Sequence, residues 1–276
     1  MVYVGQPCTL AVTKIVEFGA YFDAKELGEV LLPLKHTPAG LSVGDRGNLF
    51  IYLDSEGEPI ATTQQPKACV GEFAFLKVAA TTKVGAFLDW GLDKDLLVPF
   101  AEQHQPMKVG RSYLVYLYIN RVDYRITASS KINQFIDDVA ADEFKPRQEV
   151  DLIIANSTDM GYKAIVNNRY WGLLYKDEIF QQLSFGQAIK GFIKQLRPDG
   201  RIDLTLQWGE KSRNKDAALI EHYLQEHNGF AAVHDKSDPK LIKQLFGISK
   251  GAFKKAVGSL YKRRIITLEP DGIRKL

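Results

Sequence analysis

One spacing pattern of glycines occurs three times along the chain, and it limits the possible folds more than any other feature. In each copy, a first position is followed by a glycine 14 residues later and by another glycine 25 residues after that. The positions are Gly5, Gly19 and Gly44 in copy one, Gly71, Gly85 and Gly110 in copy two, and Arg147, Gly161 and Gly186 in copy three. Self-similarity at a fixed period is the signature of repeated structural units, so the sequence predicts three copies of one small fold.

The residues around these glycines predict that each copy is a small β-barrel. Runs such as 74–80, 85–90 and 113–119 are short, rich in β-branched or aromatic residues, and bounded by turn residues. Each copy ends in a hairpin signal, which is clearest in the segment Arg197-Pro198-Asp199-Gly200. About five strands in about 65 residues fit a closed barrel of the OB type. Glycines within a strand are typical of a sharp bend at a barrel corner, which accounts for Gly19, Gly85 and Gly161.

The end of the chain predicts three helices and a hairpin. The first helix covers 216–226, the second follows Ser237 or Asp238 as N-cap with Pro239 at its first position, and the third follows Ser249 as N-cap. Segments 265–268 and 273–276 can then pair as strands across a Pro-Asp-Gly turn. This order is that of a winged-helix domain, which either places its later helix in a nucleic-acid groove or contacts proteins.

A connecting segment separates copies two and three. Its apolar residues Ile132, Phe135, Ile136 and Val139 are at helical spacing, so we expect a short acidic helix that ends at Pro146. Its carboxylates favour a solvated face over a metal site, because no histidine or cysteine accompanies them. The fold is therefore expected to be mostly β and multidomain, with three tandem OB barrels before an α+β winged helix. The expected borders are 1–66, 67–132, 133–146 for the connecting helix, 147–210 and 211–276.

The motifs of the three copies resemble the RNA-binding repeat of ribosomal protein S1. That repeat usually reads FGAF, then G-L-V-H, then V-G, then G-R-I-x-L-S. Copy one contains FGAYFDA, GEVLLPL and LSVGD, and copy three closes with the segment Gly200-Arg201-Ile202-Asp203-Leu204-Thr205. Three such repeats followed by a basic helical domain resemble the bacterial conserved virulence factor B family over nearly the whole chain. The family is described as RNA-binding, so the resemblance implies RNA binding rather than catalysis.

Carried over to this sequence, the repeat motif indicates candidate RNA contacts. Single strands are held by bases stacked on aromatic rings and by basic groups along the phosphates. The two aromatic places of FGAF correspond to Phe18 and Tyr21 in copy one, Val84 and Phe87 in copy two, and Met160 and Lys163 in copy three. The histidine place corresponds to Leu32, Val98 and Tyr175, and the late arginine place to Pro59, Asp123 and Arg201. The surviving rings are interpreted as either stacking platforms or packing residues.

Charge is distributed unevenly among the predicted domains. Residues 211–276 contain 14 basic and 7 acidic side chains, whereas copy one contains 4 basic and 8 acidic ones. Copy two contains 9 basic and 6 acidic side chains, and copy three contains 8 of each. An acidic copy one should repel phosphates, and a basic tail suggests a polyanionic partner. Copy three and the winged helix are therefore expected to be the main RNA platform, with copies one and two as contributors or protein-contact modules.

These arguments give a set of candidate RNA-binding residues. In the barrels they are Phe18, Tyr21, Phe87, Tyr175, Lys190, Lys194, Arg197 and Arg201. In the last helix they are Lys254, Lys255, Lys262 and Arg263, which the apolar positions 253, 256, 257 and 260 place outward or on the flanks. That outward face offers almost no base-reading side chain, so we expect mainly phosphate contacts there.

The sequence argues against several other classes of protein. It contains no GxxxxGK[ST] loop, no HExxH motif, no GxSxG motif and no histidine cluster at metal-ligand spacing, so we expect no enzyme, metal or cofactor. It has no run of about 18 apolar residues and no secretory-type start, and Cys8 and Cys69 lack CxxC spacing. We therefore expect a cytoplasmic protein with free thiols and no membrane contact.

Three functions remain as hypotheses. The first is a non-enzymatic protein that binds single-stranded RNA and regulates gene expression after transcription. The second is an adaptor whose repeats and winged helix dock on ribosome or RNA-processing proteins. The third is a DNA-binding regulator that uses only the winged helix, and it requires a preference for duplex DNA.

Overall fold

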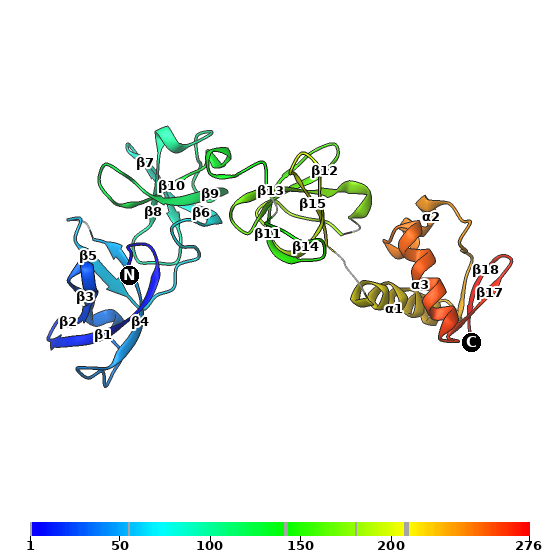
Figure 1. Ribbon diagram of the computed structural model, residues 1–276, viewed down its shortest axis with the longest axis horizontal. Helices are drawn as coiled ribbons and strands as arrows, with labels where there is room; N and C mark the ends of the chain where they lie inside the picture. The colour runs from blue at the N-terminus through cyan, green and yellow to red at the C-terminus, as the bar shows by residue number, and fades with distance from the viewer. Residues whose placement is uncertain (1, 55, 141–142, 180, 207–209) are drawn as a thin grey trace. The chain divides into compact units, whose positions relative to one another are not determined.

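Three closed five-stranded barrels follow one another along the chain, and a small helical domain follows them (Figure 1). The structure is a computed structural model, and it describes residues 2–54, 56–140, 143–179, 181–206 and 210–276. The chain divides into two compact units, Met1–Ile136 and Asp137–Leu276. The first unit contains barrels one and two, and the second contains barrel three and the helical domain.

The barrels have one topology. Barrel one contains β1 (Pro7–Val16), β2 (Gly19–Asp23), β3 (Glu29–Pro33), β4 (Arg46–Leu53) and β5 (Pro59–Thr62). Barrel two contains β6 (Phe73–Thr82), β7 (Gly85–Asp89), β8 (Leu96–Pro99), β9 (Ser112–Ile119) and β10 (Ile126–Ser129). Barrel three contains β11 (Glu149–Ser157), β12 (Gly161–Val166), β13 (Tyr170–Tyr175), β14 (Ala188–Leu196) and β15 (Ile202–Thr205). In each, the fifth strand lies between the third and the fourth, which confirms the expected OB-type barrels.

The sequence repeat is reproduced in the backbone. The first position of each copy has a positive φ, which is 83° at Gly5, 92° at Gly71 and 75° at Arg147. Each of these N–H groups donates a 2.8 Å hydrogen bond to the fourth strand, where the acceptors are the carbonyls of Ile51, Leu117 and Ile193. Arg147 therefore keeps the conformation of the glycine that it replaces, although a non-glycine residue rarely adopts it.

The second glycine of each copy is required by a close approach of two strands. Gly19, Gly85 and Gly161 each begin the second strand of their barrel. A Cβ atom at these positions would lie 2.1, 2.3 and 2.0 Å from a carbonyl oxygen of the third strand. Only glycine allows this approach, so these residues serve the barrel backbone, as the sequence predicts.

Barrels one and two are joined by shared packing. Phe50 and Tyr52 of β4 belong to the hydrophobic core of barrel two, and the Phe50 ring meets Trp90 edge-on at a centroid distance of 5.7 Å. Asp93 adds polar contacts to barrel one: it pairs with Lys35, accepts from Gln64 Nε2 at 2.9 Å, and lies 3.1 Å from His36 Nε2. These hydrogen bonds, first that from Lys35, lower the pKa of Asp93 to about 2.

The predicted connecting helix over 133–146 is wrong for the described residues beyond Phe135. The structure has a 3₁₀ turn at Ile132–Phe135, and the Phe135 ring stacks on Tyr116 of barrel two at 4.2 Å. Asp137 then forms a parallel bridge with Tyr170 of barrel three. Tertiary packing and pairing with the barrels therefore override the helical periodicity of this segment. Residues 141 and 142 lie outside the described residues.

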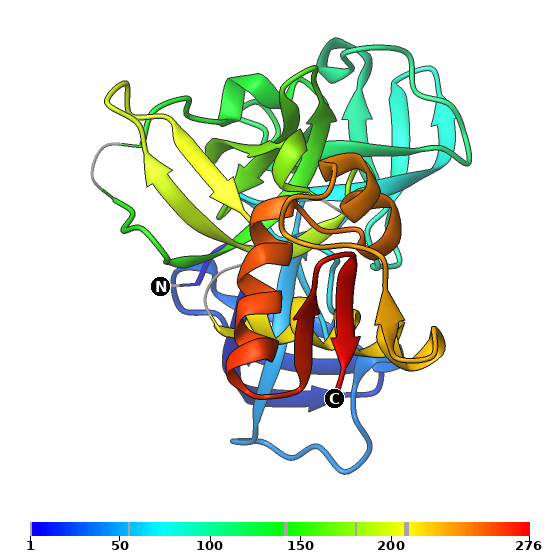
Figure 2. The same ribbon diagram turned by 90° about the vertical axis from the view of Figure 1, so that its right-hand side faces the viewer.

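The C-terminal domain has the expected winged-helix order. It contains α1 (Glu210–Glu226), β16 (Phe230–Ala231), α2 (Pro239–Phe246), α3 (Lys250–Lys262), β17 (Ile266–Glu269) and β18 (Gly272–Lys275). Asp238 and Ser249 are the N-caps, and their side chains accept hydrogen bonds from the N–H groups of Lys240 and Ala252. The β17–β18 hairpin runs beside α3 (Figure 2), and α1 begins six residues earlier than its predicted start at Asp216. The short strand β16 has no counterpart in the sequence-based prediction.

Candidate nucleic-acid interface

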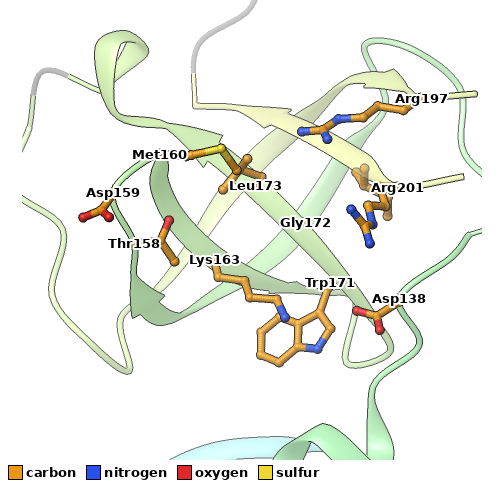
Figure 3. A pocket seen from close by; sticks show the side chains of 11 residues that line it. Asp138, Thr158, Asp159, Met160, Lys163, Trp171, Gly172, Leu173, Arg197 and Arg201 are labelled. Atoms are coloured by element: carbon orange, nitrogen blue, oxygen red, sulfur yellow. The ribbon is translucent and has the colours of Figure 1, made fainter. Parts of the chain in front are cut away.

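A pocket of about 480 Å³ opens on one face of barrel three (Figure 3). Its walls come from the β11–β12 turn, β12, β13 and the β14–β15 hairpin, and Asp138 of the segment before β11 adds a side chain. These are the second and third strands and the two loops that OB folds use to bind oligonucleotides. The pocket therefore lies where the fold itself places a nucleic-acid site.

An indole and a lysine form the base of this pocket. Trp171 on β13 is only 7% exposed, and the Lys163 ammonium lies 4.0 Å from the centroid of its ring. Burial lowers the pKa of Lys163, while the nearby charge of Asp138 acts in the opposite direction. Arg201 also lines the pocket, with a side chain that is 64% exposed. The indole is almost fully buried and Lys163 lies over one face of its ring, so the pocket offers cations beside a ring, groups of the kinds that hold phosphates and bases of single strands.

Trp171 has no equivalent in the other barrels, and motif comparison misses it. Strand register pairs Lys163 with Leu173, just as it pairs Tyr21 with Leu31 and Phe87 with Leu97. Two residues before these leucines stand Trp171, Glu29 and Asp95, respectively. Barrel three therefore presents an indole where barrels one and two present carboxylates. The only sequence signal is an unmatched tryptophan in an aligned strand.

Tyr175 and Arg197 are tied into a partly buried network. Asp203 is 1% exposed and forms an ion pair with Arg197 at 2.7 Å. The Tyr175 hydroxyl accepts from Arg197 at 2.5 Å and donates to Asp203 at 3.2 Å, and Gln195 donates to Asp203 at 2.7 Å. Burial acts to raise the pKa of Asp203, but hydrogen bonds from Arg197 and Gln195 outweigh it and hold that pKa below its ordinary value. These contacts engage the Tyr175 hydroxyl in hydrogen bonds and fix the side chain of Arg197 at the wall of the pocket.

The remaining predicted cations of barrel three differ in position. Lys190 pairs with Asp151 at 2.5 Å, and Lys194 pairs with Glu178. Neither lysine lines the pocket, whereas Arg197 and Arg201 do. Lys194 and Arg197 both lie near the Tyr175 ring, at 5.4 and 5.9 Å from its centroid, so two of the four basic residues line the pocket and a third lies next to one of them.

Strand register corrects two of the motif equivalences. Tyr175 pairs with Gly161 as Pro33 pairs with Gly19 and Pro99 with Gly85. Its equivalents are therefore the two prolines rather than Leu32 and Val98, which are fully buried. The fifth strands align in the same way, because Leu31, Leu97 and Leu173 pair in parallel with Ile60, Thr127 and Asp203. Arg201 stands two residues before Asp203, so its equivalents are Glu58 and Arg125 rather than Pro59 and Asp123.

The predicted rings of barrels one and two occupy different surroundings. Phe18 is 57% exposed, and its ring meets the half-buried Tyr21 edge-on at a centroid distance of 6.4 Å. Phe87 lines a cavity of about 600 Å³ that also includes Tyr52 from barrel one. The charged residues of that cavity are of both signs: Asp54, Lys94, Asp95, Asp123 and Arg125.

The basic residues of α3 lie where the helical pattern predicts. Phe253, Ala256, Val257 and Leu260 are buried in the domain core. The side chains on the opposite face or at the end of the helix are exposed, and they are Lys254, Lys255, Lys262 and Arg263. They form a cationic surface suited to phosphate contacts.

Other features of the described residues bear on the class of protein. Among them there is no group of three or more histidine, cysteine, aspartate or glutamate side chains placed to hold a metal ion. Cys8 and Cys69 are free. None of the helices in the described ranges is long and apolar enough to cross a membrane.

Comparison with known proteins agrees with this architecture. Residues 4–64 match the S1 domain, and residues 218–274 match the CvfB-like winged helix domain. Conserved virulence factor B of Staphylococcus aureus (strain bovine RF122 / ET3-1) is 29% identical, over 84% of this chain and 80% of that protein. The protein of strain USA300 has the same identity and coverage. A crystal structure of a multidomain protein with nucleic acid binding domains from Streptococcus pneumoniae TIGR4 is 23% identical, with coverage of 99% and 98% and a TM-score of 0.42.

The barrels and the winged helix define a multidomain protein built from nucleic-acid-binding domain classes, and neither matched class is a family of enzymes. The particular family that this chain resembles is conserved virulence factor B, as its motifs predict.

Proposed function

We propose that this protein binds single-stranded RNA and catalyses no reaction. Bases would enter the pocket beside Trp171, and phosphates would contact Arg201 and the basic face of α3. The observation that carries the proposal is the position of that pocket, because it lies on the OB-fold binding face and combines a ring with cations. A protein that binds transcripts in this way would act as a regulator of gene expression after transcription.

A titration against three nucleic acids tests the proposal. Single-stranded RNA, single-stranded DNA and duplex DNA of equal length are compared at two salt concentrations. We expect the RNA to bind most tightly and its affinity to fall steeply with salt, because phosphate contacts release counterions. A preference for duplex DNA would instead support a regulator that uses the winged helix. Absence of binding to all three would contradict the proposal.

A second candidate function rests on barrel one. Phe18 and Leu34 are 57% and 60% exposed on a copy that contains twice as many acidic as basic side chains. Exposed apolar side chains on an acidic domain are suited to a protein partner, such as a ribosome or RNA-processing component. Recovery of the same proteins in a pull-down after RNase treatment would support this adaptor function.

A further inference from the structure

We propose that the pocket of barrel three selects guanine, and that Asp138 is the residue that determines this preference. The proposal rests on the proposed RNA binding and adds the identity of the base. It concerns a carboxylate from the segment before β11, which belongs to no motif of the repeat.

The segment that carries Asp138 is fastened to barrel three on both sides of this residue. The Asp137 N–H donates to the carbonyl of Arg169 at 2.8 Å, and the Trp171 N–H donates to the carbonyl of Asp137 at 2.9 Å. The Ala140 N–H donates to the carbonyl of Gly200 at 2.9 Å. The backbone of Asp138 is therefore held between β13 and the β14–β15 hairpin, which keeps its side chain at the pocket.

Three charged groups converge on the space beside the indole. Figure 3 shows the carboxylate of Asp138, the ammonium of Lys163 and the guanidinium of Arg201 directed toward the region around Trp171. The charges of Asp138 and Arg201 act on Lys163 in opposite directions, which places all three within electrostatic reach. The pocket, about 480 Å³ in volume, has room for a single base.

Guanine matches this set of groups better than the other bases. Its N1–H and N2 amino group are adjacent donors, and a carboxylate can accept from both in charge-assisted hydrogen bonds. Its O6 and N7 atoms are acceptors that suit Lys163 and Arg201. Adenine and cytosine present an unprotonated ring nitrogen beside the amino group, and uracil flanks its N–H with two carbonyls. Each of these would bring a lone pair against Asp138.

The test compares short uridine oligonucleotides that differ at one central base, which is uridine, guanosine, adenosine, cytidine or inosine. We expect guanosine to strengthen binding by about tenfold over uridine, and inosine, which lacks the N2 amino group, by less. Asp138→Asn should remove the preference, so that the guanosine and the all-uridine strands bind with equal affinity. Asp159→Asn, at the same pocket rim but on the β11–β12 turn, should keep the preference and is the matched control.

The outcomes separate this inference from the proposed function. Binding of all five oligonucleotides with equal affinity would overturn the guanine preference and leave RNA binding intact. A guanine preference that persists in a folded Asp138→Asn protein, or is lost in Asp159→Asn instead, would overturn the role of Asp138. Absence of binding to every oligonucleotide would contradict the proposed function itself, and the inference would fail with it.

Discussion

Barrels one and three share a backbone but differ in the chemistry of their binding faces. Both keep the strand order, the positive φ at the first repeat position and the close approach at the second glycine. Barrel one retains the aromatic pair Phe18 and Tyr21 on an acidic copy. Barrel three has Met160 and Lys163 at those places, yet it has the pocket with Trp171 and Arg201.

This difference shows that the motif and the binding surface are separate properties of the repeat. The second and third glycines and the core residues maintain the barrel, and they are present in every copy. The side chains on the open face do not stabilise the barrel, so each copy can carry its own set. Barrel three combines a ring with cations, whereas barrel one carries its rings on a copy with twice as many acidic as basic side chains, and we therefore expect RNA at barrel three.

The largest expected effect concerns the network beneath the barrel-three site. Asp203→Asn leaves Arg197 without its counter-charge and should lower the free energy of unfolding by about 2 kcal/mol. Barrel one has the apolar Ile60 at the equivalent place. Denaturant unfolding measures the change, and Asp199→Asn in the exposed turn of the same hairpin is the control. Equal stability of the Asp203→Asn protein and the wild type would contradict this account of the network.

The same network predicts a pH dependence. Because the pKa of Asp203 is lowered in the folded state, its ionised form stabilises the fold. This contribution is complete above the unfolded carboxyl pKa of about 3.9 and is lost as the pH falls through the lower folded value. The stability difference between wild type and Asp203→Asn should therefore shrink below about pH 4. A difference that stays constant across this range would show that Asp203 is not ionised in the fold.

The next largest effect concerns RNA affinity. Lys163→Ala with Arg201→Ala should weaken binding of single-stranded RNA by about tenfold, because two cations leave the pocket. Lys14→Ala with Arg46→Ala removes the same charge from exposed positions of barrel one and should change affinity much less. Fluorescence anisotropy on the full chain compares the two pairs. Equal losses would mean that RNA responds to total charge rather than to the barrel-three pocket.

A smaller and less specific effect is expected from α3. Replacing Lys254, Lys255 and Lys262 by alanine should weaken binding equally for all RNA sequences, since these side chains face phosphates rather than bases. The log–log salt slope should decrease by about 0.7 for each phosphate that the variant no longer neutralises. Titrations of two unrelated RNA sequences at several salt concentrations measure both effects. An unchanged affinity and slope in the folded triple variant would exclude α3 from the interface.

The smallest effect on RNA is expected from barrel one. Phe18→Ala with Tyr21→Ala should leave RNA affinity and melting temperature nearly unchanged, because copy one has twice as many acidic as basic side chains and Phe18 is exposed. Affinity measurement and thermal unfolding of the same sample check this. A decrease in RNA affinity as large as that of the Lys163→Ala, Arg201→Ala protein would show that Phe18 and Tyr21 stack on bases, and would contradict the proposed difference between the barrels.

The sequence predicts the fold better than the site, for a physical reason. A backbone that repeats needs glycines at the same strained or crowded positions, so the glycine spacing predicts all three barrels. Copy three can be aligned by its other two glycines, although Arg147 stands at its first position. Caps at Asp238 and Ser249 are local signals that mark two helices correctly. The helix expected in the connecting segment is wrong because its apolar residues have partners in the barrels, which a local pattern does not reveal.

The site depends on contacts that the sequence does not display. Alignment of the motifs can be wrong by one or two residues along a strand, and for this reason it assigns the wrong equivalents to Tyr175 and Arg201. Lys190 and Lys194 pair with carboxylates that the sequence does not indicate, and their contact with RNA stays a prediction. Trp171 and Asp138 match no motif, and they come together only because β13 and the connecting segment pair.

Cross-linking tests the central claim, that RNA binds at barrel three, most directly. A single-stranded RNA containing 4-thiouridine is irradiated with the full chain, and the cross-linked peptides are identified by mass spectrometry. The account predicts cross-links within residues 158–175 and 197–202, the segments that contribute residues to the pocket, and additional ones near α3. Cross-links confined to barrel one, around Phe18, Tyr21 and Leu34, would contradict it.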